Sequence, residues 1–80
     1  MTEVEIEYCV PCGHRDNAQE VQTAVLEEFG QEVDRVALKT GDSGVFKVRV
    51  DGDIVFDKAD EEFSVEGIVD SVRRAHVSAA

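Results

Sequence analysis

Two cysteines are the residues whose type and spacing in this chain are best suited to chemistry. Cys9 and Cys12 are its only cysteines, and Val10 and Pro11 separate them in a C-x-x-C motif. The motif follows an alternating segment and precedes a segment with helical periodicity, so we expect it at a strand-to-helix junction. Three kinds of chemistry use such a pair: a structural disulfide, a metal site and reversible thiol–disulfide exchange.

The spacing gives little support to the first two uses. A disulfide that closes so short a loop removes little entropy from the unfolded chain, on the order of 2 kcal/mol. A closed zinc site needs four ligands. Only Cys9, Cys12 and His14 are close in the sequence, and His76 lies far along the chain. No second C-x-x-C is present, so a metal site would have to be shared across a dimer.

Reversible redox chemistry is the use that the placement of the pair favours. The amino-terminal end of a helix carries unpaired N–H groups and partial positive charge, which stabilise a thiolate and lower the pKa of a cysteine there. The thiolate is the species that attacks a disulfide, and a cysteine three residues away can resolve the mixed disulfide. Pro11 restricts the turn between them. We therefore predict that Cys9 and Cys12 are the catalytic residues.

Other motifs with known chemistry are absent or are better explained by structure. The chain contains no P-loop, no G-x-G-x-x-G and no H-E-x-x-H sequence. Ser43 and Ser64 have no plausible base near them, and Ser64 is suited to cap a helix. The acidic pairs Glu27-Glu28 and Glu61-Glu62 are expected on a solvated surface. Nothing in the sequence requires a cofactor.

Hydrophobic periodicity predicts the elements that must position the pair. Residues 3–8 alternate, with Val4, Ile6 and Tyr8 on one side and glutamates on the other, as in a strand with one buried face. Apolar residues at three- and four-residue spacing predict one helix over residues 14–29 and another that starts after Ser64. Further strands are predicted over residues 33–38, 45–50 and 54–56, with a loop at 40–44 and a type I′ turn at 51–52.

The predicted element order is β-α-β-β-β-α, in a single domain over residues 1–80. A strand–helix–strand unit predicts a parallel crossover, and the later strands an antiparallel hairpin, so the four-stranded sheet is mixed. Because the strands have one polar face, we expect both helices on the other face, in a two-layer α/β sandwich of the thioredoxin-like type. Tyr8, next to Cys9, is expected to border the site. The open sheet face and the loop at 40–44 are expected to shape partner choice.

The charge balance excludes several classes of function. The 80 residues include 18 Asp and Glu but only 8 Lys and Arg, which gives a formal net charge of −10. Nucleic acids and anionic membrane surfaces are disfavoured as partners, because both require a basic surface. No apolar run is long enough to span a bilayer, and the first residues do not have the pattern of a signal peptide. We therefore expect a soluble, cytoplasmic protein.

The acidic residues are spread along the chain and lysines are few, a pattern that resembles cytoplasmic proteins of salt-accumulating archaea. Such a surface repels itself unless salt screens the charges. The composition therefore predicts a halophilic, acidic protein whose stability increases with salt.

Three segments carry a resemblance to a known family. The run Tyr8–Gly13 with its C-x-x-C, the segment Gly44–Val48 and the Asp51-Gly52 hairpin are similar to the selenoprotein W family, also called the Rdx or SelT/SelW/SelH group. The likeness extends from the first strand through the last helix, in the same element order. It implies a thioredoxin-like fold and a thiol redox protein whose counterparts are glutathione or the thiols of partner proteins.

The resemblance also bears on the order of attack. Cys12 stands where selenium-containing members carry selenocysteine, which implies that Cys12 is the more reactive residue, whereas the logic of thioredoxins favours Cys9. Thioredoxins proper place a cis-proline opposite the motif, and the only proline here is Pro11. An ordinary thioredoxin or glutaredoxin is therefore disfavoured, and the order of attack stays open.

The sequence thus predicts a thiol–disulfide oxidoreductase in which Cys9 and Cys12 cycle between dithiol and disulfide. Its partners would be protein thiols and disulfides or small-molecule thiols. Two alternatives stay open: a non-enzymatic redox-sensing adaptor, and a metal site shared across a dimer.

Overall fold

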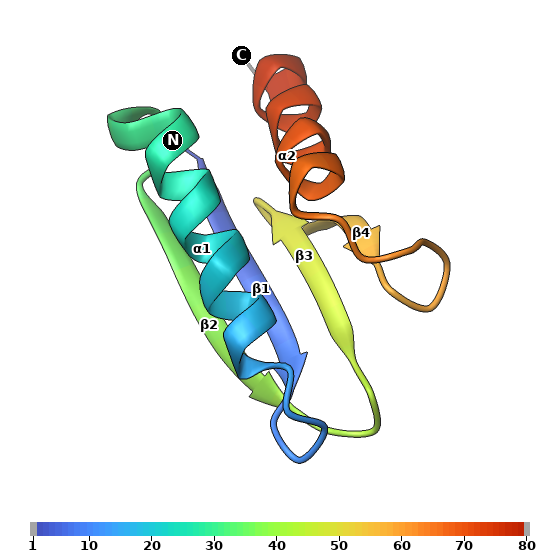
Figure 1. The fold of residues 1–80 in the computed structure, drawn as a ribbon. Coiled ribbons are helices and arrows are strands. Elements are labelled where there is room, and N and C mark those ends of the chain that lie inside the picture. Colours follow the sequence, from blue (N-terminus) through green and yellow to red (C-terminus); the bar gives the residue numbers. More distant parts are fainter. Residues whose placement is uncertain (1, 80) are drawn as a thin grey trace.

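Four strands form one mixed sheet, which both helices cover on the same face (Figure 1). The computed structural model describes residues 2–79, with side chains described through residue 76. The elements are β1 (Glu3–Cys9), α1 (Arg15–Phe29), a short 3-10 helix (Gly30–Glu32), β2 (Arg35–Gly41), β3 (Phe46–Val50), β4 (Asp53–Asp57) and α2 (Val65–Ala79). This architecture confirms the predicted β-α-β-β-β-α sandwich.

The strand order is β2-β1-β3-β4, so β1 lies inside the sheet. It pairs parallel to β2, with Cys9 opposite Gly41, and antiparallel to β3, with Tyr8 opposite Phe46. Because β2 and β3 lie on opposite sides of β1, the connection between them must cross the carboxyl end of β1. That end carries the first cysteine.

Alternating side chains build the core between the sheet and the helices. Val4, Ile6 and Tyr8 of β1 are buried, and the glutamates between them lie on the open face. The inner face of α1 contributes the stripe that the helical spacing predicts. Its buried members are Ala18, Val21, Val25 and Phe29.

The local signals at turns and helix ends behave largely as their chemistry predicts. Asp51 and Gly52 have φ values of +51° and +90°, as a type I′ hairpin turn requires. The Ser64 hydroxyl accepts a hydrogen bond of 3.1 Å from the amide of Gly67, which confirms Ser64 as the cap of α2. Gly30 also has a positive φ, but its ψ of −124° lies outside the left-handed helical region, and the chain continues into the 3-10 helix.

The second strand differs from its predicted bounds. It covers Arg35–Gly41 and so includes Thr40 and Gly41, which composition assigns to a loop. The reason is tertiary, because β1 supplies a parallel partner as far as Cys9. The loop is correspondingly shorter, at residues 42–45.

The acidic side chains lie at the surface. Glu5, Glu7 and Asp57 are half-buried, and the other fifteen of the 18 are exposed. Neither of the two described helices combines the length and apolar composition needed to cross a bilayer.

This surface predicts a dependence of stability on salt. We expect the melting temperature to rise by at least about 5 °C between 0.1 and 2 M KCl, which corresponds to about 1 kcal/mol in a domain of this size. The rise follows because salt screens the mutual repulsion of a chain with a net charge of −10. Circular dichroism at both salt concentrations measures it, and an unchanged melting temperature contradicts it.

Candidate functional site

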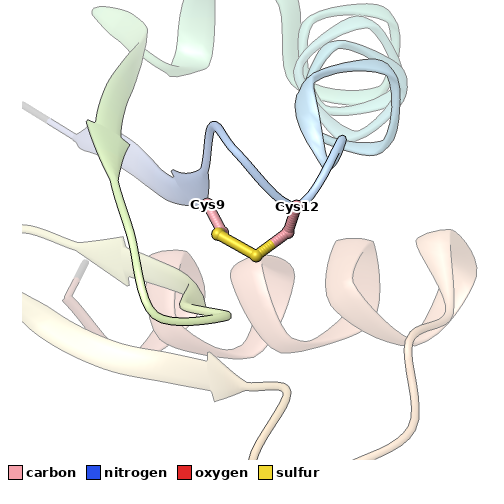
Figure 2. Close-up of a disulfide and its surroundings, with 2 residues drawn as sticks. All are labelled: Cys9 and Cys12. Carbon is pink, nitrogen blue, oxygen red and sulfur yellow. A yellow bond between two sulfur atoms is a disulfide. The ribbon is translucent and has the colours of Figure 1, made fainter.

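A disulfide joins Cys9, the last residue of β1, to Cys12, three residues before α1 begins (Figure 2). Their Cα atoms are 5.3 Å apart, inside the range that a disulfide spans without moving the backbone. The structure therefore places the two cysteines together at the predicted strand-to-helix junction.

Backbone hydrogen bonds hold the turn between the cysteines. The amide of Gly13 donates to the carbonyl of Val10 at 3.2 Å, and the amide of His14 donates to the carbonyl of Cys9 at 3.3 Å. Gly13 has a φ of +78°, where a residue with a Cβ atom would be strained. Cys12 lies within this turn and is an exposed residue.

The two cysteines differ sharply in exposure. Cys9 is 0% exposed, whereas Cys12 is an exposed residue. The connection between β2 and β3, residues 42–45, is called the crossing loop, and the chain at each end of it bonds to the end of β1. The amide of Cys9 donates to the carbonyl of Val45 at 2.8 Å, and the amide of Val10 donates to the carbonyl of Gly41 at 3.1 Å. Of the two cysteines, only Cys12 is therefore accessible to solvent.

Gly41 allows the crossing loop to pack this closely. A Cβ atom at this position would lie 2.7 Å from Cγ1 of Val45 and 3.2 Å from Oε2 of Glu7. Both distances are shorter than ordinary contacts, so the side chains of Val45 and Glu7 would have to move to accept a Cβ atom here. Gly41 thus favours close packing where β2 passes into the crossing loop beside Cys9.

The amino-terminal end of α1 leaves backbone donors available beside the cysteines. His14 occupies the cap position and makes no side-chain capping hydrogen bond. The first N–H groups of a helix have no partner within the helix, and their partial positive charge favours a nearby anion such as a thiolate. The carboxylate of Asp16 in the first turn opposes this effect.

The two histidines of the metal alternative lie at opposite ends of the fold. The ring of His14 packs edge-on against Phe46, with centroids 6.1 Å apart. Nδ1 of His76 is 2.9 Å from the hydroxyl of Thr2, which precedes β1, so His76 lies at the opposite end of that strand from Cys9. Among the side chains that the structure describes, no three His, Cys, Asp or Glu residues gather closely enough to hold a metal ion.

A hollow of about 360 Å³ adjoins the turn of the disulfide, and we call it the Tyr8 hollow. Tyr8 of β1 and Thr40 of β2 are register partners, so their side chains share the helix-covered face of the sheet. The hollow is lined by Tyr8, Val10, Gly13, Arg15, Asp16 and Thr40. Tyr8 is predicted to border the site, and Thr40 is the first residue of the loop predicted at 40–44; their register in the sheet brings both to the lining of this hollow.

A larger hollow, of about 680 Å³, runs along α1 toward Val65. Its lining contains several acidic side chains. Neither hollow is lined by a cysteine, so the candidate site is the disulfide together with the turn that carries it.

Charged side chains pair on the open face of the sheet, close to the end that carries the disulfide. Nη1 of Arg49 donates to Glu7 at 2.9 Å and to Glu5 at 3.3 Å. The hydrogen bond from Arg49 holds the pKa of Glu7 below its ordinary value of 4.5, and the positive charges of Lys39 and Lys47 add to the effect.

The lowered pKa predicts how Glu7→Gln changes stability with pH. Because the folded-state pKa lies below the unfolded one, ionised Glu7 stabilises the fold above pH 4.5, and this contribution is lost as pH falls through the folded value. We expect the variant to lose about 0.5–1 kcal/mol of unfolding free energy at pH 7 and almost none at pH 2. Urea denaturation at fixed ionic strength measures both values.

Glu5→Gln is the matched control, since Glu5 lies farther from Arg49 and is 42% exposed, against 19% for Glu7. Glu5→Gln should lower the unfolding free energy by less than Glu7→Gln does. An equal loss of unfolding free energy in both variants at every pH would contradict the assignment of the pH-dependent stability to the Glu7–Arg49 pair.

The fold and the site together define a thioredoxin-like protein of the selenoprotein W type, with a C-x-x-C pair at the junction of β1 and α1. The chain belongs to the Rdx family, which matches residues 3–74. This membership confirms the resemblance seen in the sequence.

Similar proteins come from animals and bacteria. Migration and invasion enhancer 1 of Mus musculus is 33% identical over 75 residues, which cover 90% of this chain, and the Bos taurus protein of the same name is 32% identical over the same length. The match covers 63% of the length of each of these relatives.

Two solved structures share the fold. The crystal structure of a Bordetella parapertussis protein superposes with a TM-score of 0.88 at 28% identity, and the match covers 92% of this chain and 96% of that one. A selenoprotein W-related protein of Vibrio cholerae gives a TM-score of 0.87 at 21% identity, covering 94% and 96%. The second likeness shows the fold alone.

Proposed function

We propose that this protein is a thiol–disulfide oxidoreductase in which Cys12 exchanges with the partner and Cys9 resolves. The observation that supports this order is the difference in exposure, with Cys12 open to solvent and Cys9 wholly buried. The uncapped start of α1 supports it as well, because its free N–H groups favour a thiolate near Cys12.

The proposed cycle transfers two electrons from the dithiol to a partner disulfide. The Cys12 thiolate attacks one partner sulfur, the partner S–S bond breaks, and the other partner sulfur leaves as a thiolate that takes up a proton. Cys9 then loses its proton and attacks Sγ of Cys12, which forms the Cys9–Cys12 disulfide and releases the second partner thiol. The partner is thereby reduced and the protein oxidised.

The same chemistry in reverse regenerates the dithiol at the expense of a small thiol. We place it in the cytoplasm, where the thiol pool is reducing enough to maintain such a cycle. The partners proposed are protein thiols and disulfides or low-molecular-weight thiols.

Turnover of a test disulfide checks the enzymatic function. With dithiothreitol as the electron donor, the wild-type protein should accelerate the reduction of insulin disulfides, and Cys9→Ser and Cys12→Ser should each abolish the acceleration. A pair that oxidises reversibly and accelerates nothing would overturn the enzymatic proposal in favour of a redox-sensing adaptor. Stoichiometric zinc or iron in the purified protein, with dimerisation that depends on it, would overturn it in favour of a shared metal site.

A further inference from the structure

We propose that the free edge of β2 docks an extended, acidic segment of a partner protein. The segment pairs as a fifth strand with the backbone of Leu38 and Thr40, and an acidic side chain at its centre lies beside Lys39. This inference goes beyond the redox chemistry proposed above and does not depend on it.

One side of β2 has no neighbouring strand, because the strand order is β2-β1-β3-β4 (Figure 1). The carbonyl of Gly41 accepts a hydrogen bond from the amide of Val10, which follows β1, so this carbonyl points to the β1 side. The peptide groups of successive residues point to opposite sides of a strand, so those of Leu38 and Thr40 point away from β1. Within the described part of the chain, no hydrogen bond from outside the sheet reaches the backbone of either residue.

Helix α1 covers the free edge at one residue only. Nε2 of Gln22 donates to the carbonyl of Val36 at 2.7 Å. Val36 lies two residues before Leu38, so its carbonyl points to the same side of β2, and Gln22 confirms the direction of the free edge. The backbone of the next two outward residues stays open to a partner.

The opposite edge of the sheet is protected from such pairing. The register of β4 with β3 shifts between Val48 and Arg49, and β4 has an aspartate at each end. The backbone carbonyl of its last residue, Asp57, accepts from the amides of Asp60 and Glu61 at 2.9 and 3.0 Å. Irregular and charged edges resist pairing with another chain. Because β2 pairs with β1 over seven residues without a shift, β2 is the edge available to a partner.

The charges on β2 select an acidic segment. The strand contains Arg35 and Lys39 but no acidic residue, in a chain whose net charge is −10. Arg35 pairs with Glu3 at 3.1 Å, whereas Lys39 is exposed and forms no ion pair among the described side chains. Glu7 is near enough to feel the charge of Lys39, but its hydrogen bond comes from Arg49. A carboxylate on an added strand would give Lys39 a cross-strand partner.

Neighbouring charges limit where that carboxylate can lie. Asp34 and Asp42 flank β2 and are exposed, so they repel an acidic side chain at either end of the added strand. Lys39 lies between the two outward residues and so favours an acidic side chain at the centre. A second copy of this chain is disfavoured, because pairing two β2 edges would bring the Arg35 and Lys39 side chains of both copies together on one face.

Three peptides that differ only at their centre test the proposal. Each is a blocked seven-residue peptide that alternates valine and threonine, with glutamate, glutamine or lysine in the middle. In NMR titrations at 0.3 M KCl, where the Debye length is about 5–6 Å, the glutamate peptide should shift the amide resonances of Leu38 and Thr40 saturably. It should bind about 2- to 5-fold more tightly than the glutamine peptide, the effect of one cross-strand charge pair. The lysine peptide should bind more weakly than both.

Two variants and a modified peptide assign the binding to this edge. Lys39→Gln should remove the preference for glutamate over glutamine. Lys58→Gln is the matched control, since this exposed lysine follows β4 at the other edge of the sheet, and it should leave the preference unchanged. A glutamate peptide methylated on every backbone nitrogen cannot donate to the edge, and it should shift neither Leu38 nor Thr40.

The possible failures are distinct. If no saturable shifts occur at Leu38 and Thr40, or if the methylated peptide reproduces them, pairing at the β2 edge is overturned. A wild-type protein without a preference for glutamate, or a preference that survives Lys39→Gln, overturns the acidic character of the segment. Analytical ultracentrifugation addresses the other occupant: a concentration-dependent dimer that shifts the same two amides would overturn the partner segment in favour of a second copy.

Discussion

The thiol of Cys12 in the Cys9→Ser variant is expected to react with iodoacetamide at least about ten times faster than the thiol of Cys9 in the Cys12→Ser variant. The reason is access, because a thiol must be reached as well as ionised to react. Cys9 is wholly buried at the end of β1, beside the crossing loop, whereas Cys12 is an exposed residue of the turn. The free N–H groups at the start of α1 add to the difference by favouring a thiolate there.

Alkylation followed by mass spectrometry measures the two rates. The same variants unfolded in urea provide the control, since both thiols should then react at similar rates. A folded Cys9 that reacts as fast as Cys12 would contradict the proposed order and restore the thioredoxin-like one, in which Cys9 attacks first.

Phe46→Ala is expected to lower the unfolding free energy by about 3–5 kcal/mol, the usual range for a large aromatic residue removed from a core. Phe46 is 1% exposed, and its ring packs edge-on against Phe63 at 5.3 Å and Phe56 at 6.2 Å between centroids. The unfolding free energy of a small domain is low, so much of this variant should be unfolded at 37 °C. Urea denaturation followed by circular dichroism measures the loss.

Phe46→Ala should also destabilise the turn that carries the disulfide. Phe46 contacts His14 at the start of α1, and it directly follows Val45, whose carbonyl accepts a hydrogen bond from the amide of Cys9. Phe63→Ala is the control, since Phe63 is only half-buried and makes its edge contact from outside the sheet. Phe63→Ala should lower the unfolding free energy by less than Phe46→Ala does. A loss below about 1 kcal/mol for Phe46→Ala would contradict the central place of this ring.

Local pattern explains why most of the fold could be predicted. Val4, Ile6 and Tyr8 alternate with glutamates, and a strand with that period can bury only one face. Asp51-Gly52 accepts positive φ at both positions, and Ser64 caps α2 because its hydroxyl is one residue before the first turn. These signals act over a few residues, so they favour the same local conformation whatever packs around the segment.

Thr40 and Gly41 show where local pattern fails. Their composition is typical of a loop, yet they continue β2 because β1 offers a parallel partner as far as Cys9. The same pairing puts Thr40 opposite Tyr8 and so forms one side of the Tyr8 hollow. Such a pairing joins residues more than thirty positions apart, and periodicity within one segment carries no information about it.

Local patterns are therefore enough to predict the element order, the acidic surface and the position of the cysteine pair between a strand and a helix. The difference in exposure between the two cysteines arises from the way the strands are arranged. The strand order β2-β1-β3 sends the chain across the end of β1, which encloses Cys9 and leaves Cys12 exposed. Strand order is set by which hydrophobic faces pack together across the whole domain, and no residue near the C-x-x-C motif specifies it.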